Sequence, residues 1–70
     1  MKEELIQVGN NIRKHRLKKN LSQGQLAARL NWQQPYLSRI ENGKAHLRLQ
    51  SYIKIAKGLK LPLRRLFDGL

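Results

Sequence analysis

The side chains that most often carry out chemistry in proteins are scarce in this sequence. Glu41 is the only carboxylate between Leu5 and Phe67, and there is no cysteine to act as a nucleophile or a metal ligand. His15 and His46 are isolated histidines with no third ligand in view, so we expect no metal site. There is also no Ser-His-acid set with workable spacing and no glycine-rich phosphate loop. The sequence therefore predicts a protein that is not an enzyme and has no cofactor.

With catalytic and metal-binding side chains scarce, the main chemical feature of the sequence is its positive charge. There are 15 Lys and Arg residues against 4 Asp and Glu residues, which gives a formal net charge of +11. A chain this basic repels itself when compact, so we expect an anionic partner. Nucleic acid is the first candidate, because neutralising phosphates releases counterions. An anionic membrane or an acidic protein is the alternative that charge alone leaves open.

The length of the chain limits its organisation. Seventy residues make one domain, which we place over residues 1–70, and such a small core often depends on compact helix packing and a partner subunit. The apolar runs are too short to span a membrane, and the start Met-Lys-Glu-Glu lacks the apolar stretch of a secretory signal. We therefore expect a soluble, cytoplasmic protein with no membrane partner.

The elements that would position functional residues are all helical. No segment alternates with period two for long enough to form a strand, so the fold class is all-α. Ser22, with Gln25 three residues later, forms a capping box at a helix start. Asn31 tolerates the left-handed backbone of a helix end, and Pro35 fits only in a first helical turn. The expected helices cover residues 2–19, 23–30, 34–42 and 49–59, with a short last helix from Pro62.

Apolar residues at helical spacing predict the core. We expect Tyr36, Tyr52 and Trp32 to be packed rather than to stack on bases, because the tyrosines fall on the apolar stripes. The other predicted core positions are Leu5, Val8, Ile12, Leu26, Ala27, Leu30, Leu37, Ile40, Leu49, Ile53, Ala56, Leu59, Leu63, Leu66 and Phe67.

Two short helices joined by a tight turn, over residues 23–30 and 34–42, have the geometry of a helix-turn-helix. The residues strengthen that interpretation. The stretches LSQGQLAARL (21–30) and YLSRIENGK (36–44) resemble the Cro/cI-like (XRE-like) helix-turn-helix family, and the resemblance extends from about Val8 to Phe67. It implies a compact five-helix bundle of the lambda-repressor-like type, with the helix-turn-helix formed by helices 2 and 3. It also implies transcriptional regulation by a homodimer on a near-palindromic operator.

The resemblance assigns base contacts to the first turns of the recognition helix. Gln34 takes the family's main base-reading position, where its amide can pair twice with adenine. Arg39 lies on the outward face and can make a two-pronged contact with guanine. Gln33 and Ser38 lie beside them and are included as base contacts. Pro35 takes a position where relatives use a polar side chain, so it can at most contact a thymine methyl.

Other positions match the family's phosphate contacts and its internal support. Gln23 matches a residue that contacts a phosphate and braces the next helix, and Arg16 with Glu41 matches a structural ion pair. Independently of the resemblance, the basic strip on the first helix brings Arg13 near phosphates. The remaining expected phosphate contacts are Asn42, Gly43 and Lys44.

These observations predict a sequence-specific regulator that binds double-stranded DNA, of the repressor or restriction–modification controller type. An antitoxin that binds a toxin and regulates its own operon is an alternative, although few residues remain after the last helix for a toxin-binding tail. A protein-interaction module that has lost DNA binding and a cationic membrane-active peptide are further alternatives. We expect no small-molecule ligand, because there is no sensor domain. The expected homodimer interface comprises Leu63, Leu66, Phe67 and Leu70.

Overall fold

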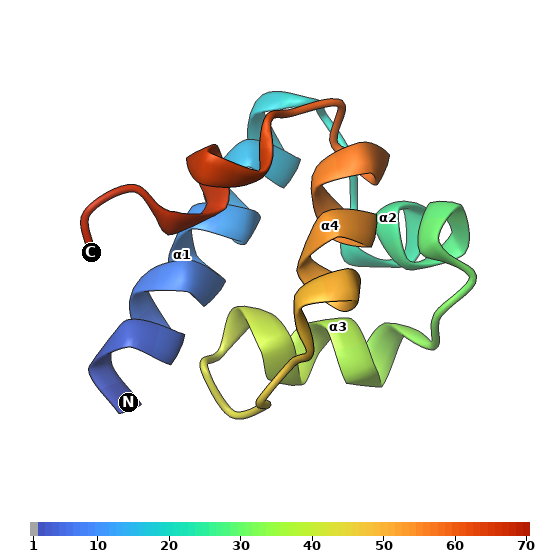
Figure 1. Cartoon of the computed structure of the whole chain (residues 1–70). Helices are drawn as coiled ribbons and strands as arrows, with labels where there is room; N and C mark the ends of the chain where they lie inside the picture. Colours follow the sequence, from blue (N-terminus) through green and yellow to red (C-terminus); the bar gives the residue numbers. More distant parts are fainter. Residues whose placement is uncertain (1) are drawn as a thin grey trace.

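The computed structural model describes residues 2–70, and within this range all of the regular secondary structure is helical (Figure 1). The all-α prediction is confirmed, but the expected fifth α-helix is wrong in type. The segment after Pro62 is a short 3₁₀ helix of 5 residues, a helix type that occurs in short pieces because its hydrogen-bond geometry is poorer than that of an α-helix. The elements are α1 (Lys2–Lys18), α2 (Gln23–Leu30), α3 (Gln34–Glu41), α4 (Leu49–Gly58) and η1 (Leu63–Phe67).

The local signals for α2 and α3 are present in the structure. The Ser22 hydroxyl accepts from the Gln25 backbone, and the Gln25 side chain accepts from the Ser22 backbone, which completes the capping box. Asn31 ends α2 in the left-handed region at φ 57°. Pro35 lies in the first turn of α3, where a missing amide hydrogen leaves no helical bond unmade. The boundaries of both short helices are thus set by residues next to them in the chain.

Two core predictions for α4 are wrong, because neither Leu49 nor Ile53 packs on the core. Leu49 was expected to face the core but is 60 % exposed, whereas Ile55 is fully buried. The inward stripe of α4 runs through Tyr52, Ile55, Ala56 and Leu59, and Leu49 lies at the edge of that stripe at the first turn. Each helix contributes to the core, whose largest fully buried side chains are Ile12, Leu26, Leu30, Leu37, Ile55, Leu59 and Leu66.

Close backbone contact fixes α3 against α1. A Cβ atom on Gly9 would lie 2.6 Å from the carbonyl oxygens of both Ile40 and Glu41, so only glycine allows this approach. Just beyond α3, Gly43 has φ +72°, and a Cβ atom there would also meet Ile6 of α1. The C-terminal end of α3 is therefore held at a fixed place on α1.

The two ends of the molecule are built differently. Helix α3 packs on α1 and α2 along one side, while η1 packs on α1 and α4 at the opposite side (Figure 1). Asn11 of α1 donates to the backbone oxygens of Leu66 at 3.0 Å and Asp68 at 2.7 Å, which fastens η1 to α1. Over residues 2–70, no helix has both the length and the apolar character needed to cross a membrane.

Candidate nucleic-acid interface

A buried ion pair lies beneath the end of α3. The Arg16 guanidinium donates to both carboxylate oxygens of Glu41, from Nε at 2.7 Å and from Nη2 at 2.9 Å. Its Nη1 donates to the backbone oxygen of Leu21 at 2.8 Å. Arg16 and Glu41 are only 6 % and 4 % exposed, so this two-pronged pair is shielded from water. The ion pair predicted from the sequence is present, and it joins α1, α3 and the segment that enters α2.

Gln23 extends this network to the start of α2. Its Nε2 donates to Glu41 Oε1 at 3.0 Å, so one carboxylate accepts bonds from α1 and from α2. Among the described residues, no buried side-chain nitrogen or oxygen lacks a hydrogen-bond partner. Fully satisfied buried networks hold their members in one arrangement. The relative position of α2 and α3 therefore rests on a polar network as well as on apolar packing.

The outer side of α3 presents amides. Gln33 precedes the helix and makes no side-chain cap bond, and Gln34 opens the helix. Gln34 Oε1 lies 3.6 Å from where a Cβ atom on Gly24 would stand, so this side chain lies over the start of α2. Neither glutamine side chain bonds to another described residue, and both are exposed. Their donors and acceptors are free to pair with a ligand that carries both kinds of group.

The expected contact residues after α3 are brought together at its C-terminal end. Arg39 is exposed, and its Nη2 donates to the backbone oxygen of Lys44 at 3.2 Å. In return, the Lys44 amide donates to the Arg39 backbone oxygen at 2.9 Å. Asn42 is the C-cap of α3, and Gly43, with a positive φ, makes the turn that leads from Asn42 to Lys44. These two bonds hold the loop against the end of α3 and place the Arg39 guanidinium beside the Lys44 backbone.

Two expected contact residues lie apart from the rest or are less exposed. Ser38, four residues after Gln34 on the same helical stripe, is half-buried. Arg13 is exposed on α1, and its side chain forms no hydrogen bond or ion pair with another described residue. Arg13 is thus the one predicted contact that comes from outside the helix-turn-helix and the loop that follows it.

The placement of Tyr36 was predicted incorrectly. Tyr36 is 38 % exposed, and its ring packs edge-to-face on Trp32 with centroids 5.0 Å apart. The Lys54 ammonium of α4 lies 5.4 Å from the Trp32 ring centroid on the same cluster. Helical spacing assigned Tyr36 to the apolar stripe, but α3 has only 8 residues and Leu37 and Ile40 fill its contact with the core. Lys54 was missed, because no local pattern pairs it with a turn two helices earlier.

The expected dimer surface also changes. Leu66 is fully buried, so it has no surface to offer to a partner, and its inclusion was wrong. Leu63 and Phe67 are half-buried against the core, and Phe67 packs edge-to-face on Tyr52 at 5.4 Å. Leu70 is 64 % exposed. The apolar surface that stays open thus lies around η1 rather than at its buried centre.

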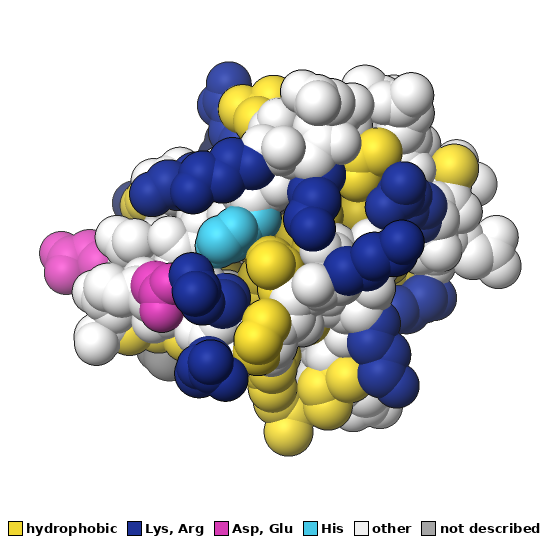
Figure 2. Space-filling model, turned by 90° about the horizontal axis from the view of Figure 1, so that it is seen from above, with side chains coloured by type: hydrophobic (Ala, Val, Ile, Leu, Met, Phe, Trp, Pro, Cys, Tyr) yellow, Lys and Arg dark blue, Asp and Glu magenta, His cyan; other side chains and the backbone are white. Residues whose placement is uncertain are grey.

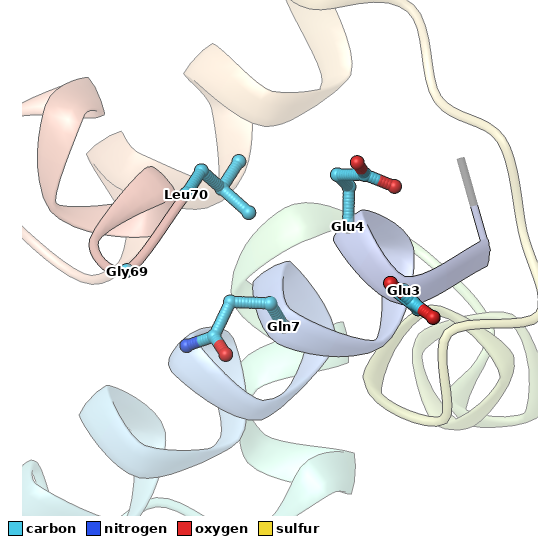
Figure 3. A pocket seen from close by; sticks show the side chains of 5 residues that line it. All are labelled: Glu3, Glu4, Gln7, Gly69 and Leu70. Carbon is cyan, nitrogen blue, oxygen red and sulfur yellow. The ribbon is translucent and has the colours of Figure 1, made fainter.

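A cavity of about 400 Å³ lies between the start of α1 and the end of the described chain (Figure 3). Its lining includes two carboxylates and the exposed Leu70, and no cation. Such a lining repels phosphate. No group of three His, Cys, Asp or Glu side chains within residues 2–70 comes close enough to hold a metal ion. The lining residues are Glu3, Glu4, Gln7, Gly69 and Leu70.

Comparisons with known proteins agree with the two-helix geometry. The helix-turn-helix family matches residues 12–66. Control protein C.MunI from Mycoplasma sp is 38 % identical over 71 residues, covering 100 % of this chain and 96 % of that protein. The restriction-modification controller protein C.AhdI from Aeromonas hydrophila superposes with a TM-score of 0.89 at 31 % identity, over 93 % of this chain and 98 % of that one. The controller protein C.Esp1396I, solved as a tetramer with its natural 35 base-pair operator, gives a TM-score of 0.81 at 34 % identity over 91 % of this chain and 84 % of that one.

Proposed function

Because this chain belongs to the helix-turn-helix family, we propose that it is a sequence-specific DNA-binding transcriptional regulator of the restriction–modification controller type. The observation that carries the proposal is the outer side of α3, where two exposed glutamine amides have no partner in the described chain while the inner side is fixed by buried contacts. A full-length relative is named as a control protein, which supports the same function. The protein then acts by binding DNA and catalyses no reaction, and it works in the cytoplasm where the DNA is.

In this proposal α3 lies in the major groove and reads base edges. The Gln34 amide carries a donor and an acceptor, which match the two groups of an adenine edge. Arg39 offers two parallel N–H donors to guanine once its single bond to the Lys44 backbone opens. Gln33 and Ser38 supply further contacts on either side of Gln34.

Phosphate contacts set the register of α3 in the groove. Gln23 stands at the start of α2, where backbone amides and the helix dipole favour an anion. Its side chain is half-exposed, so it can keep its bond to Glu41 while its other atoms meet a phosphate. Asn42, Gly43 and Lys44 form the second contact at the end of α3, and Arg13 of α1 forms a third.

We also infer that the protein acts as a homodimer that presents two recognition helices about one helical turn of DNA apart. With Leu66 buried, the interface that we propose uses the exposed apolar side chains next to it. Leu49 is 60 % exposed, and Ile53 lies four residues later on the same side of α4 without packing on the core. Together with Leu63, Phe67 and Leu70, they extend the apolar surface around η1.

Leu49→Glu is expected to weaken dimerisation and operator binding with little loss of folding stability, because Leu49 has little buried area to lose. Sedimentation equilibrium measures the dimer, and chemical denaturation measures the fold. Leu66→Glu is the contrasting variant and is expected to unfold the protein, since it places a charge in the core. A Leu49→Glu protein that dimerises like the wild type would contradict this interface.

Selection of binding sites from a random duplex library tests the function itself. We expect the wild type to enrich a two-fold symmetric site, and Gln34→Ala and Arg39→Ala each to relax particular positions in both halves. Asn10→Ala is the matched control, because Asn10 is an exposed amide on α1 and belongs to neither helix of the helix-turn-helix. The proposal fails if the wild type enriches no site, or if Asn10→Ala relaxes the same positions as Gln34→Ala.

A further inference from the structure

Most of the positive charge of this protein lies away from its recognition helix. Arg39 is the only cation in α3, and Lys44 follows in the adjoining loop. A larger group gathers where α1 and α4 end and η1 begins, at the end of the molecule opposite α3. We call this group the basic pole, and it comprises Lys14, Lys18, Lys19, Lys57, Lys60, Arg64 and Arg65.

Three separate elements build the basic pole. Helices α1 and α4 both end on this side, and η1 packs on both of them (Figure 1). The pKa of His15 is lowered, first by burial and then by the positive charges of Lys18 and Arg65, which shows that cations from α1 and η1 act on one point. Figure 2 views this side and shows Lys and Arg side chains spread across it among hydrophobic side chains, with two acidic side chains on its left part, one of them next to a Lys or Arg side chain. The pole is therefore one surface, made by the tertiary structure.

The cations of the pole are not neutralised by the protein. All seven are exposed, and none of their side chains forms a hydrogen bond or an ion pair with another described residue. Asp68 is the one carboxylate whose charge acts on the pKa of His15, which it raises against the effect of the nearby cations. Lys18 and Lys57 lie in the last turns of α1 and α4, where a cation favours the helix dipole. Arg64 and Arg65 lie in the short helix η1, and the repulsion among seven like charges opposes folding.

Operator binding through α3 does not use this surface. The ends of α1 and α4, which carry the pole, lie on the opposite side of the molecule from α3 (Figure 1). A straight duplex held against α3 therefore lies on the far side of the protein from the pole. A cationic surface built from several elements, with no base-reading amides in it, suits a phosphate backbone rather than a base sequence.

We propose that the basic pole binds the phosphate backbone of a second DNA duplex, without regard to its sequence, while α3 holds the operator. The proposal rests on the proposed function for the first duplex and adds a second site to it. In a dimer that presents both α3 helices to one operator, the side of each protomer opposite α3 faces away from that operator. The protein then links its operator to a neighbouring DNA segment.

A bridging assay tests this second site. Operator duplex from the selection experiment is fixed to a surface and saturated with protein, and labelled non-operator duplex is added at several salt concentrations. The pole variant Lys18→Gln, Lys57→Gln, Arg65→Gln takes one exposed cation from each element. We expect it to capture at least about tenfold less of the second duplex, with a salt dependence shallower by about 3 in log–log slope, since each lost phosphate contact removes about 0.9. Its operator affinity is expected to stay within about threefold of the wild type.

Two control variants separate the sites. Lys18→Arg, Lys57→Arg, Arg65→Lys keeps every charge and is expected to capture the second duplex like the wild type. Gln34→Ala with Arg39→Ala is expected to lose operator selectivity and still bind non-operator duplex. Far-ultraviolet circular dichroism and thermal unfolding check that each variant is folded.

Several outcomes overturn the proposal. Undiminished capture by the pole variant would show that the pole is not the second site, and an equal loss of operator affinity would make it part of the first. Capture of anionic lipid vesicles with no capture of duplex would assign the pole to a membrane instead. If selection enriches no operator, the proposed function fails, while the pole is still tested by comparing the charge-removing and charge-keeping variants on two non-operator duplexes.

Discussion

The inner and outer sides of α3 differ in how many contacts they make with the rest of the protein. On the inner side, Leu37 and Ile40 are buried, and Glu41 accepts bonds from Arg16 and Gln23. On the outer side, Gln33 and Gln34 are exposed and bond to no other described residue. The inner contacts fix the direction of the helix, so the side chains of Gln33 and Gln34 are not needed to hold it in place. Changes on the inner side should therefore act on folding, and changes on the outer side on DNA binding.

The largest expected effect is on the inner side. Arg16→Ala leaves the buried Glu41 carboxylate without its main partner, and breaking a buried pair in this way costs about 3–5 kcal/mol of unfolding free energy. Urea denaturation measures the loss. The double variant Arg16→Met, Glu41→Leu removes both charges and is the control, expected to be more stable than the single variant. A loss under about 1 kcal/mol for Arg16→Ala would mean that the inner side does not depend on this pair.

The outer side gives a smaller effect in a different measurement. Gln34→Ala is expected to reduce discrimination at its base pair by about 1–3 kcal/mol, because it removes a two-bond contact with adenine. The unfolding free energy should change by no more than about 0.5 kcal/mol, since Gln34 is exposed. Fluorescence anisotropy on matched and mismatched operators measures the first quantity, and urea denaturation the second. A large loss of stability in Gln34→Ala would break the distinction between the two sides.

The smallest expected effect is a change in unfolding free energy at the aromatic cluster beside α3. Trp32 is half-buried beside α3, Tyr36 is exposed on it, and the Lys54 ammonium lies 5.4 Å from the Trp32 ring centroid. Lys54→Gln is expected to lower the unfolding free energy by about 0.5–1 kcal/mol through loss of the cation–π contact. Trp32 is the only tryptophan, so its fluorescence reports the change directly. Lys57→Gln, an exposed cation one turn later on α4, is the matched control and should leave the emission unaltered.

The elements that the sequence predicted best are those with their signals close by in the chain. The start of α2 follows from Ser22 and Gln25, and its end follows from Asn31, because capping bonds span only a few residues. At the start of α4, Arg48 makes no side-chain cap bond, and Leu49 was assigned to the wrong face. Without a local cap, the inward face of that helix depends on what it packs against. Periodicity alone did not decide whether a residue at the edge of the apolar stripe, such as Leu49, is buried.

The candidate site divides in the same way. The resemblance led to the Arg16–Glu41 pair, but the third partner, Gln23 Nε2, and the backbone oxygen of Leu21 came only from the structure. Tyr36 was assigned to the core because helical spacing does not say how many side chains a short helix can bury. Lys54 lies 22 positions after Trp32 in the chain, and no spacing rule connects them. These contacts depend on how separate helices meet.

The sequence by itself determined the all-helical class, the helix-turn-helix and the amides on its outer face, because period, capping residues and family motifs act within one or two helical turns. Only the tertiary structure decided that Leu66 is buried, that Leu49 is exposed, and that the last helical segment is a 3₁₀ helix. It also decided that the cations of α1, α4 and η1 form one surface opposite α3. Charge composition counts lysines and arginines, but their position in space is set by the packing of helices that are distant in the chain.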